Sequence, residues 1–151
     1  MSVRSRRLIA GAALLAGGVV AAPLVAVPAM AADGGRPLST VLTGAAEVPG
    51  PGDPDGTGTA SVRVNVGKAH VCVDLTVMNI DPATGAHIHE GAADEAGPVV
   101  VGLMPPTSGM SSGCYSVTRE LAKEILKDPA DYYVNVHNAA FPGGAVRGQL
   151  G

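Results

Sequence analysis

The chain has 151 residues, with ten Lys and Arg against thirteen Asp and Glu, and its formal net charge at neutral pH is −3. An acidic balance without a basic stripe argues against nucleic acid or an anionic membrane surface as a partner. The sequence has no Trp and a single Phe, which leaves few aromatic platforms for stacking on sugars or bases. The 21 Gly and 12 Pro favour many short strands joined by turns.

The N-terminus has the order of an export signal. Three arginines among the first seven residues precede an uncharged apolar run from Leu8 to Met30, which leads into the small-x-small pattern Ala29-Met30-Ala31. We therefore assign residues 1–32 to a signal peptide, cleaved after Ala31 or Ala32, and expect a secreted, extracellular protein. The alternative is a retained anchor, because the run is long enough to span a bilayer. Its glycines, prolines and cleavage pattern favour removal, so we expect no stable membrane anchor after cleavage.

Alternation of apolar and polar residues predicts short β-strands through the rest of the chain. Gly, Pro, Ser or acidic composition predicts loops at residues 50–56, 90–97 and 104–112. The continuous apolar run 98–103 predicts a buried strand. The predicted strands are residues 37–43, 59–66, 71–77, 85–89, 98–103, 114–117, 132–137 and 145–150.

One amphipathic helix is predicted after Thr118, which is suited to cap its N-terminus. Asp128-Pro129 ends this helix, because the residue before a proline avoids helical conformation. Its apolar face consists of Leu121, Ala122, Ile125 and Leu126. Eight or so short strands with one helix insertion predict an all-β fold, an antiparallel Greek-key β-sandwich or barrel, in one domain.

Cys72 and Cys114 are the only cysteines. An even count in an exported chain predicts a disulfide. Strand alternation places both side chains away from the predicted core, and this matching sidedness makes the bridge geometrically reasonable. Two free thiols are the alternative.

Three of the four histidines lie on the side of their strands that faces away from the predicted core. His87 and His89 point the same way and Ile88 points the other way, because side chains alternate along a strand. In residues 133–137 two valines make the core face, so His137 also faces away. Imidazole suits Cu, Zn and Ni, which makes the three histidines candidate metal ligands. Packing or hydrogen bonding beneath a loop is the alternative role.

Five stretches together resemble the motifs of one domain family, in the family's order. They are residues 42–49 (LTGAAEVP), 86–91 (AHIHEG), 97–101 (GPVVV), 133–137 (YVNVH) and 142–150 (PGGAVRGQL). The sequence is therefore similar to the CHRD domain, the module repeated in chordin, over residues 38–151. This resemblance implies an exported β domain from a family without established catalysis, in which bacterial members are secreted single-domain proteins. A binding module is then expected rather than an enzyme.

A shorter resemblance concerns the histidines. Residues 85–90 are similar to the copper-binding strand of Cu/Zn superoxide dismutases, whose fold is also a Greek-key barrel with a disulfide. The similarity implies that His87 and His89 correspond to paired copper ligands and that His137 is a third. The loop 90–97 contains no histidine, so neither the bridging histidine nor the zinc loop has a counterpart. A dinuclear Cu/Zn site is not expected, and a mononuclear site stays open.

Two classes of function remain at this stage. The first is a secreted CHRD-domain binding or structural module without catalysis or cofactor, whose partner is an unidentified extracellular protein or ligand. The second is a mononuclear histidine protein that binds copper or zinc, with a redox or metal-scavenging role. Glu47 and Arg147 are in addition a candidate ion pair between the first and last strands.

Overall fold

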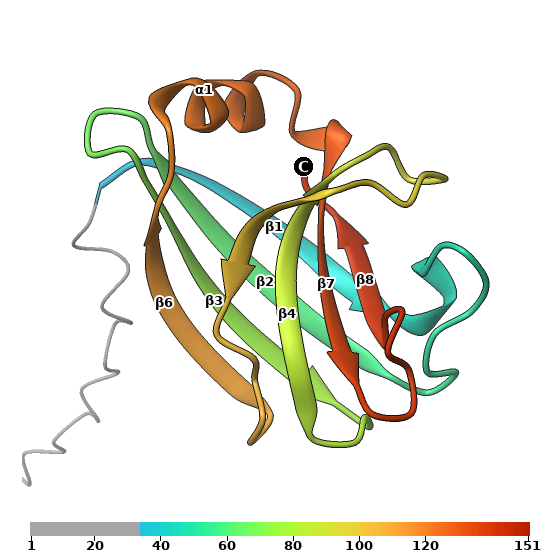
Figure 1. The fold of residues 1–151 in the computed structure, drawn as a ribbon. Coiled ribbons are helices and arrows are strands. Elements are labelled where there is room, and N and C mark those ends of the chain that lie inside the picture. The colour runs from blue at the N-terminus through green and yellow to red at the C-terminus, as the bar shows by residue number, and fades with distance from the viewer. Residues whose placement is uncertain (1–33) are drawn as a thin grey trace, which may run out of the picture.

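The structure is a computed structural model that describes residues 34–151, and the predicted signal peptide lies outside these residues. Eight strands are joined in chain order by one α-helix and two short 3-10 turns (Figure 1). The strands are β1 (Arg36–Thr43), β2 (Thr57–Asn65), β3 (His70–Met78), β4 (Ala83–Glu90), β5 (Val99–Leu103), β6 (Met110–Ser116), β7 (Tyr132–Asn138) and β8 (Val146–Gln149). The 3-10 turns are η2 (Gly44–Ala46) and η3 (Pro129–Asp131).

All strands pair antiparallel in one sheet of order β5-β4-β7-β8-β1-β2-β3-β6, which curls into a nearly closed barrel. The alternating apolar side chains of these strands point inward and form the core. Side chains bridge the gap between β5 and β6. The Tyr115 hydroxyl accepts from the backbone N–H of Met104 at 2.7 Å, and the Ser111 hydroxyl donates to the Met104 carbonyl at 2.7 Å. The predicted all-β class is confirmed.

The helix α1 (Arg119–Lys127) lies across one end of the barrel (Figure 1). As predicted, Thr118 caps it, because its hydroxyl accepts from the backbone N–H of Leu121 at 3.1 Å. Ala122 and Ile125 are buried against the core. In the part of the chain that the structure describes, no helix has the length and apolar character needed to cross a bilayer.

Two predictions about the strands that flank the gap are wrong in detail. β5 is half-buried rather than fully buried, since Val99 is 52% exposed while Val101 and Leu103 face the core. Residues 110–112 belong to β6 and not to the predicted loop, because β6 pairs with β3 as far as Met110 opposite Thr76. The Ser and Gly residues there carry no strand signal of their own, so the neighbouring strand imposes their conformation.

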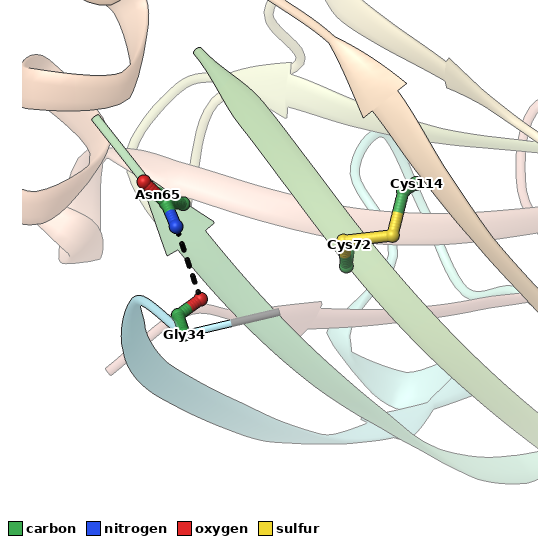
Figure 2. Close-up of a disulfide and its surroundings, with 4 residues drawn as sticks. All are labelled: Gly34, Asn65, Cys72 and Cys114. Atoms are coloured by element: carbon green, nitrogen blue, oxygen red, sulfur yellow. Dashed lines mark hydrogen bonds between the residues drawn. A yellow bond between two sulfur atoms is a disulfide. The ribbon is translucent and has the colours of Figure 1, made fainter. Parts of the chain in front are cut away.

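The predicted disulfide is confirmed. Cys72 on β3 and Cys114 on β6 are directly opposite each other, and their sulfur atoms are bonded at 2.02 Å (Figure 2). The same view shows the Asn65 side-chain amide donating to the Gly34 carbonyl at 3.4 Å, a contact that ties the start of the described chain to β2. The disulfide therefore links β6, at one end of the sheet order, to β3, the strand with which it pairs.

Replacing Cys72 and Cys114 together by Ser should lower the free energy of unfolding. The bridge spans 42 residues of sequence, and the chain-entropy model gives about 4 kcal/mol for a loop of that length as an upper figure. Urea unfolding of the oxidised wild type and the double variant measures the difference. Unfolding midpoints that coincide would contradict a stabilising role for the bridge.

Candidate metal centre

The pairing of β4 with β7 positions the three histidines. Gly85 is opposite His137 in this register, and His87 and His89 follow on the same face of β4. Ile88, between the two histidines, is fully buried in the barrel. The histidine side chains therefore share the outer face of the sheet, as strand alternation predicts.

The three imidazole rings converge on one point. One nitrogen from each of His87, His89 and His137 can be chosen so that the three lie within 4.8 Å of one another. His87 Nδ1 and His137 Nε2 are already 3.0 Å apart. Metal–nitrogen bonds of about 2.0–2.1 Å place ligand nitrogens roughly 3.3 Å apart in a tetrahedral site. The widest separation, at most 4.8 Å, would have to shorten to complete a three-nitrogen set.

Two backbone carbonyls fix the tautomers of two rings. His89 Nδ1 lies 2.8 Å from the Gly97 carbonyl, and His137 Nδ1 lies 3.1 Å from the Pro142 carbonyl. A carbonyl can only accept, so both Nδ1 atoms carry the proton, and both Nε2 atoms present a lone pair. His87 Nδ1 then donates to His137 Nε2, a hydrogen bond that a metal ion would replace.

The free nitrogen of His89 is the feature that points most directly to a ligand. His89 Nε2 is buried and has no hydrogen-bond partner. Buried polar atoms in folded proteins are nearly always satisfied, and one that is not calls for an explanation. A metal ion bound by the three rings would satisfy it, because Nδ1 is bonded to the Gly97 carbonyl and Nε2 is the nitrogen of His89 that is left for a ligand.

Burial favours the neutral form of two of the rings, His87 and His137. Burial lowers the pKa of His87 below its usual 6.5, and the nearby His137 and His89 lower it further. Burial also lowers the pKa of His137, while its hydrogen bond to the Pro142 carbonyl acts in the opposite direction. Neutral imidazole is the form that binds metals, so these shifts favour binding at neutral pH.

A stack of three planar groups supports His89. The His89 ring lies parallel to the Tyr133 ring, with centroids 4.8 Å apart and an interplanar angle of 10°. On the Tyr133 ring lies the Arg147 guanidinium, whose Cζ is 3.4 Å from the ring centroid. This is close range for a cation–π contact. The stack restricts the ring of His89 to one plane.

Arg147 also holds the loop that covers the stack. Its guanidinium donates to the carbonyls of Glu95 at 2.8 Å and Ala92 at 2.6 Å. The Tyr133 hydroxyl accepts from the backbone N–H of Gly97 at 3.1 Å, next to the carbonyl that binds His89. The sequence predicts Arg147 to face outward, and it does leave the barrel interior. It is nevertheless only 1% exposed, because the loop 91–97 closes over it.

Glu47 is a second buried ionisable group on this side of the barrel. Burial raises its pKa to about 7, although the charge of Arg147 and hydrogen bonds from Asn135 and the Val48 backbone act to lower it. One carboxyl oxygen, Oε1, is buried without a partner. A Cβ at Gly144 would lie 2.3 Å from this carboxyl group, so a glycine there makes room for it. The Arg147 nitrogens donate hydrogen bonds to the loop carbonyls, and Arg147 affects Glu47 through its charge. A direct Glu47–Arg147 ion pair stays a prediction.

Sequence reasoning missed Tyr133, Asn135 and Gly97 as parts of the site. The first two precede His137 by four and two residues on β7, so strand alternation alone places them on the histidine face. That signal was available in the sequence. The role of Gly97 was not, because it acts through its backbone carbonyl.

Residues 38–150 match the CHRD domain family model. No curated protein and no solved structure matches the chain significantly. The match spans all eight strands except the first two residues of β1. It therefore covers the barrel and every residue of the candidate metal centre.

Replacing Glu47 by Gln should change how stability depends on pH. The folded chain holds the Glu47 proton up to about pH 7, whereas an ordinary carboxyl loses it near 4.5. Wild-type stability therefore falls as pH rises through this window, and Gln removes that decline. Thermal unfolding between these pH values should show a Glu47→Gln advantage that grows with pH. The exposed Glu124→Gln is the control, and parallel curves for wild type and Glu47→Gln would refute the assignment.

Proposed function

The chain belongs to the CHRD domain family, and we propose that it is a secreted member that binds one copper or zinc ion through His87, His89 and His137. Family membership supports a binding or structural module. The proposed role is metal binding, not catalysis. We propose metal scavenging outside the cell as its role, because scavenging requires only that the metal is bound, whereas a redox role also requires a second reactant.

One observation carries the proposal: His89 Nε2 is buried without a partner, and His89 belongs to a group of three histidines whose ring nitrogens, one from each, lie within 4.8 Å of one another. Backbone carbonyls hold the rings of His89 and His137 in the tautomer that exposes Nε2. Metal-binding histidines commonly donate their other ring N–H to a carbonyl or carboxylate in this way. A purely structural cluster would leave this buried nitrogen without a partner, whereas a bound metal ion would supply one.

The donor set favours transition metals with an affinity for imidazole. Three neutral nitrogens and no carboxylate suit copper or zinc rather than magnesium or calcium, which prefer oxygen. His87 and His137 are partly exposed, so water or a small ligand can reach the bound ion. An open position of this kind accompanies three protein ligands in many zinc sites.

Secretion is part of the proposal. The disulfide between Cys72 and Cys114 fits an oxidising compartment, and CHRD domains are extracellular in their family. The N-terminal sequence also supports secretion, because basic residues, an apolar run and a small-x-small site follow one another as in an export signal. We propose an extracellular protein or ligand as partner and neither nucleic acid nor membrane, in line with the acidic composition.

Calorimetric titration of the metal-free protein with Cu²⁺ and with Zn²⁺ tests the site. Wild type should bind one equivalent, and His89→Ala should weaken binding by about 100-fold or more because it removes a ligand. His70→Ala is the matched control, since His70 begins β3 and is not part of the cluster. Identical isotherms for wild type and His89→Ala would leave the cluster as a structural feature only.

The pH dependence of binding should follow the lowered pKa values of His87 and His137. Protons compete with the metal at each ring below its pKa, and the lowered values move this competition at His87 and His137 to more acidic pH than at ordinary histidines. An NMR pH titration of the ring protons in the metal-free protein measures both values. Ring protons of His87 and His137 that titrate at the ordinary histidine value of 6.5 or above would contradict the prediction.

A further inference from the structure

The histidine cluster lies above a glycine, and this leaves one of its sides open. A Cβ at Gly85 would lie 3.5 Å from Cε1 of His87 and 3.6 Å from Cδ2 of His137. The two rings therefore lean over a position that carries no side chain. His137 flanks Gly85 on the β7 side, and β5 runs along the other side of β4 (Figure 1).

The register of β5 on β4 places a methionine at that open side. Ala86 is opposite Leu103, and His87 is opposite Gly102. Met104 follows directly after the end of β5, and extending the same register by one residue would set it beside Gly85. Leu103 faces the core at 8% exposed, and Met104 is 59% exposed, as expected for the next residue on the outer face.

The backbone of Met104 supports this placement. Its N–H and C=O bond the Tyr115 hydroxyl and the Ser111 hydroxyl, both on β6, and so they point away from β4. In an antiparallel pair, residues whose polar groups point away from the partner form the narrow pairs, with Cα atoms about 4.5 Å apart. Side chains in such pairs are close neighbours.

The thioether of Met104 is therefore within reach of the cluster. Methionine is unbranched and has three rotatable bonds, so its sulfur can extend over the adjacent Gly85. A Cβ at Gly102 would meet no atom within 4 Å, which leaves the β5 side of His87 unobstructed. The largely exposed Met104 side chain can swing inward without disturbing the core.

We propose that Met104 supplies a thioether sulfur as fourth ligand to the metal ion, and that the site consequently selects copper, as Cu(I), over zinc. This inference rests on the proposed function, because it needs the three histidines to bind a metal. Thioether sulfur is a soft ligand that favours Cu(I), while imidazole alone serves copper and zinc alike. Three nitrogens and one sulfur complete a four-coordinate ion.

Anaerobic competition with a chromogenic Cu(I) chelator tests the proposal on the whole mature chain. Met104→Leu keeps the size and apolar character of the side chain but removes the sulfur. It should weaken Cu(I) binding by about tenfold or more and leave Zn²⁺ affinity unchanged. Met110→Leu is the matched control. Met110 is also exposed, at 71%, but it lies on β6, where it pairs with Thr76 of β3 and not with β4 or β7.

Equal Cu(I) affinity of wild type and Met104→Leu would overturn the proposal, and so would an equal loss of Cu(I) and Zn²⁺. If His89→Ala loses both metals while Met104→Leu retains Cu(I), only the role of Met104 fails. If wild type binds neither metal, the proposed function itself fails.

X-ray absorption of the Cu(I) protein gives a second readout. One sulfur neighbour should be present in wild type and absent in Met104→Leu, and an all-nitrogen shell in wild type would contradict the proposal.

Discussion

The antiparallel register between β4 and β7 is the constraint on which the candidate metal centre depends. It sets Gly85 opposite His137 and His87 opposite Asn135, so that imidazoles from two strands meet above a position without a side chain. A slip of one residue would exchange the faces of a strand and turn its histidines into the core. The buried Ile88 and Val134, directly opposite each other in the same pairing, prevent that slip, because their exposure would remove apolar surface from the barrel interior.

The residues that surround the three histidine rings hold those rings in fixed orientations. The loop 91–97 brings the Gly97 carbonyl to His89, and Arg147 holds that loop through two of its carbonyls while lying on the ring of Tyr133. A buried guanidinium needs such partners, since burying a charge without them is costly. Burial beside Gly52 and Gly144 explains the raised pKa of Glu47, whose main cause is loss of water around the carboxyl group. Burial on this side of the barrel thus shapes both the metal ligands and their ionisable neighbours.

The parts of the site that could be predicted from the sequence are those fixed by strand alternation. The period of two placed His87, His89 and His137 on the outer face, and it placed Cys72 and Cys114 on matching sides. The burial of Arg147 could not be predicted in this way, because the carbonyls it binds are more than fifty residues away in the chain. Nor could the tautomers, since the Gly97 and Pro142 groups that fix them are backbone carbonyls, which every residue has. Tertiary packing decides both.

The central claim is that the metal-free chain already holds His89 and His137 in the tautomer with an Nε2 lone pair, and long-range ¹H–¹⁵N correlation of the histidine side chains tests it most directly. Each ring nitrogen reports whether it carries a proton, and the geometry requires Nδ1–H with an unprotonated Nε2 for His89 and His137. Addition of one equivalent of Zn²⁺ should then shift both Nε2 resonances and His87 Nδ1 and leave His70 unchanged. Finding Nε2–H tautomers for His89 and His137 in the metal-free protein would contradict the account.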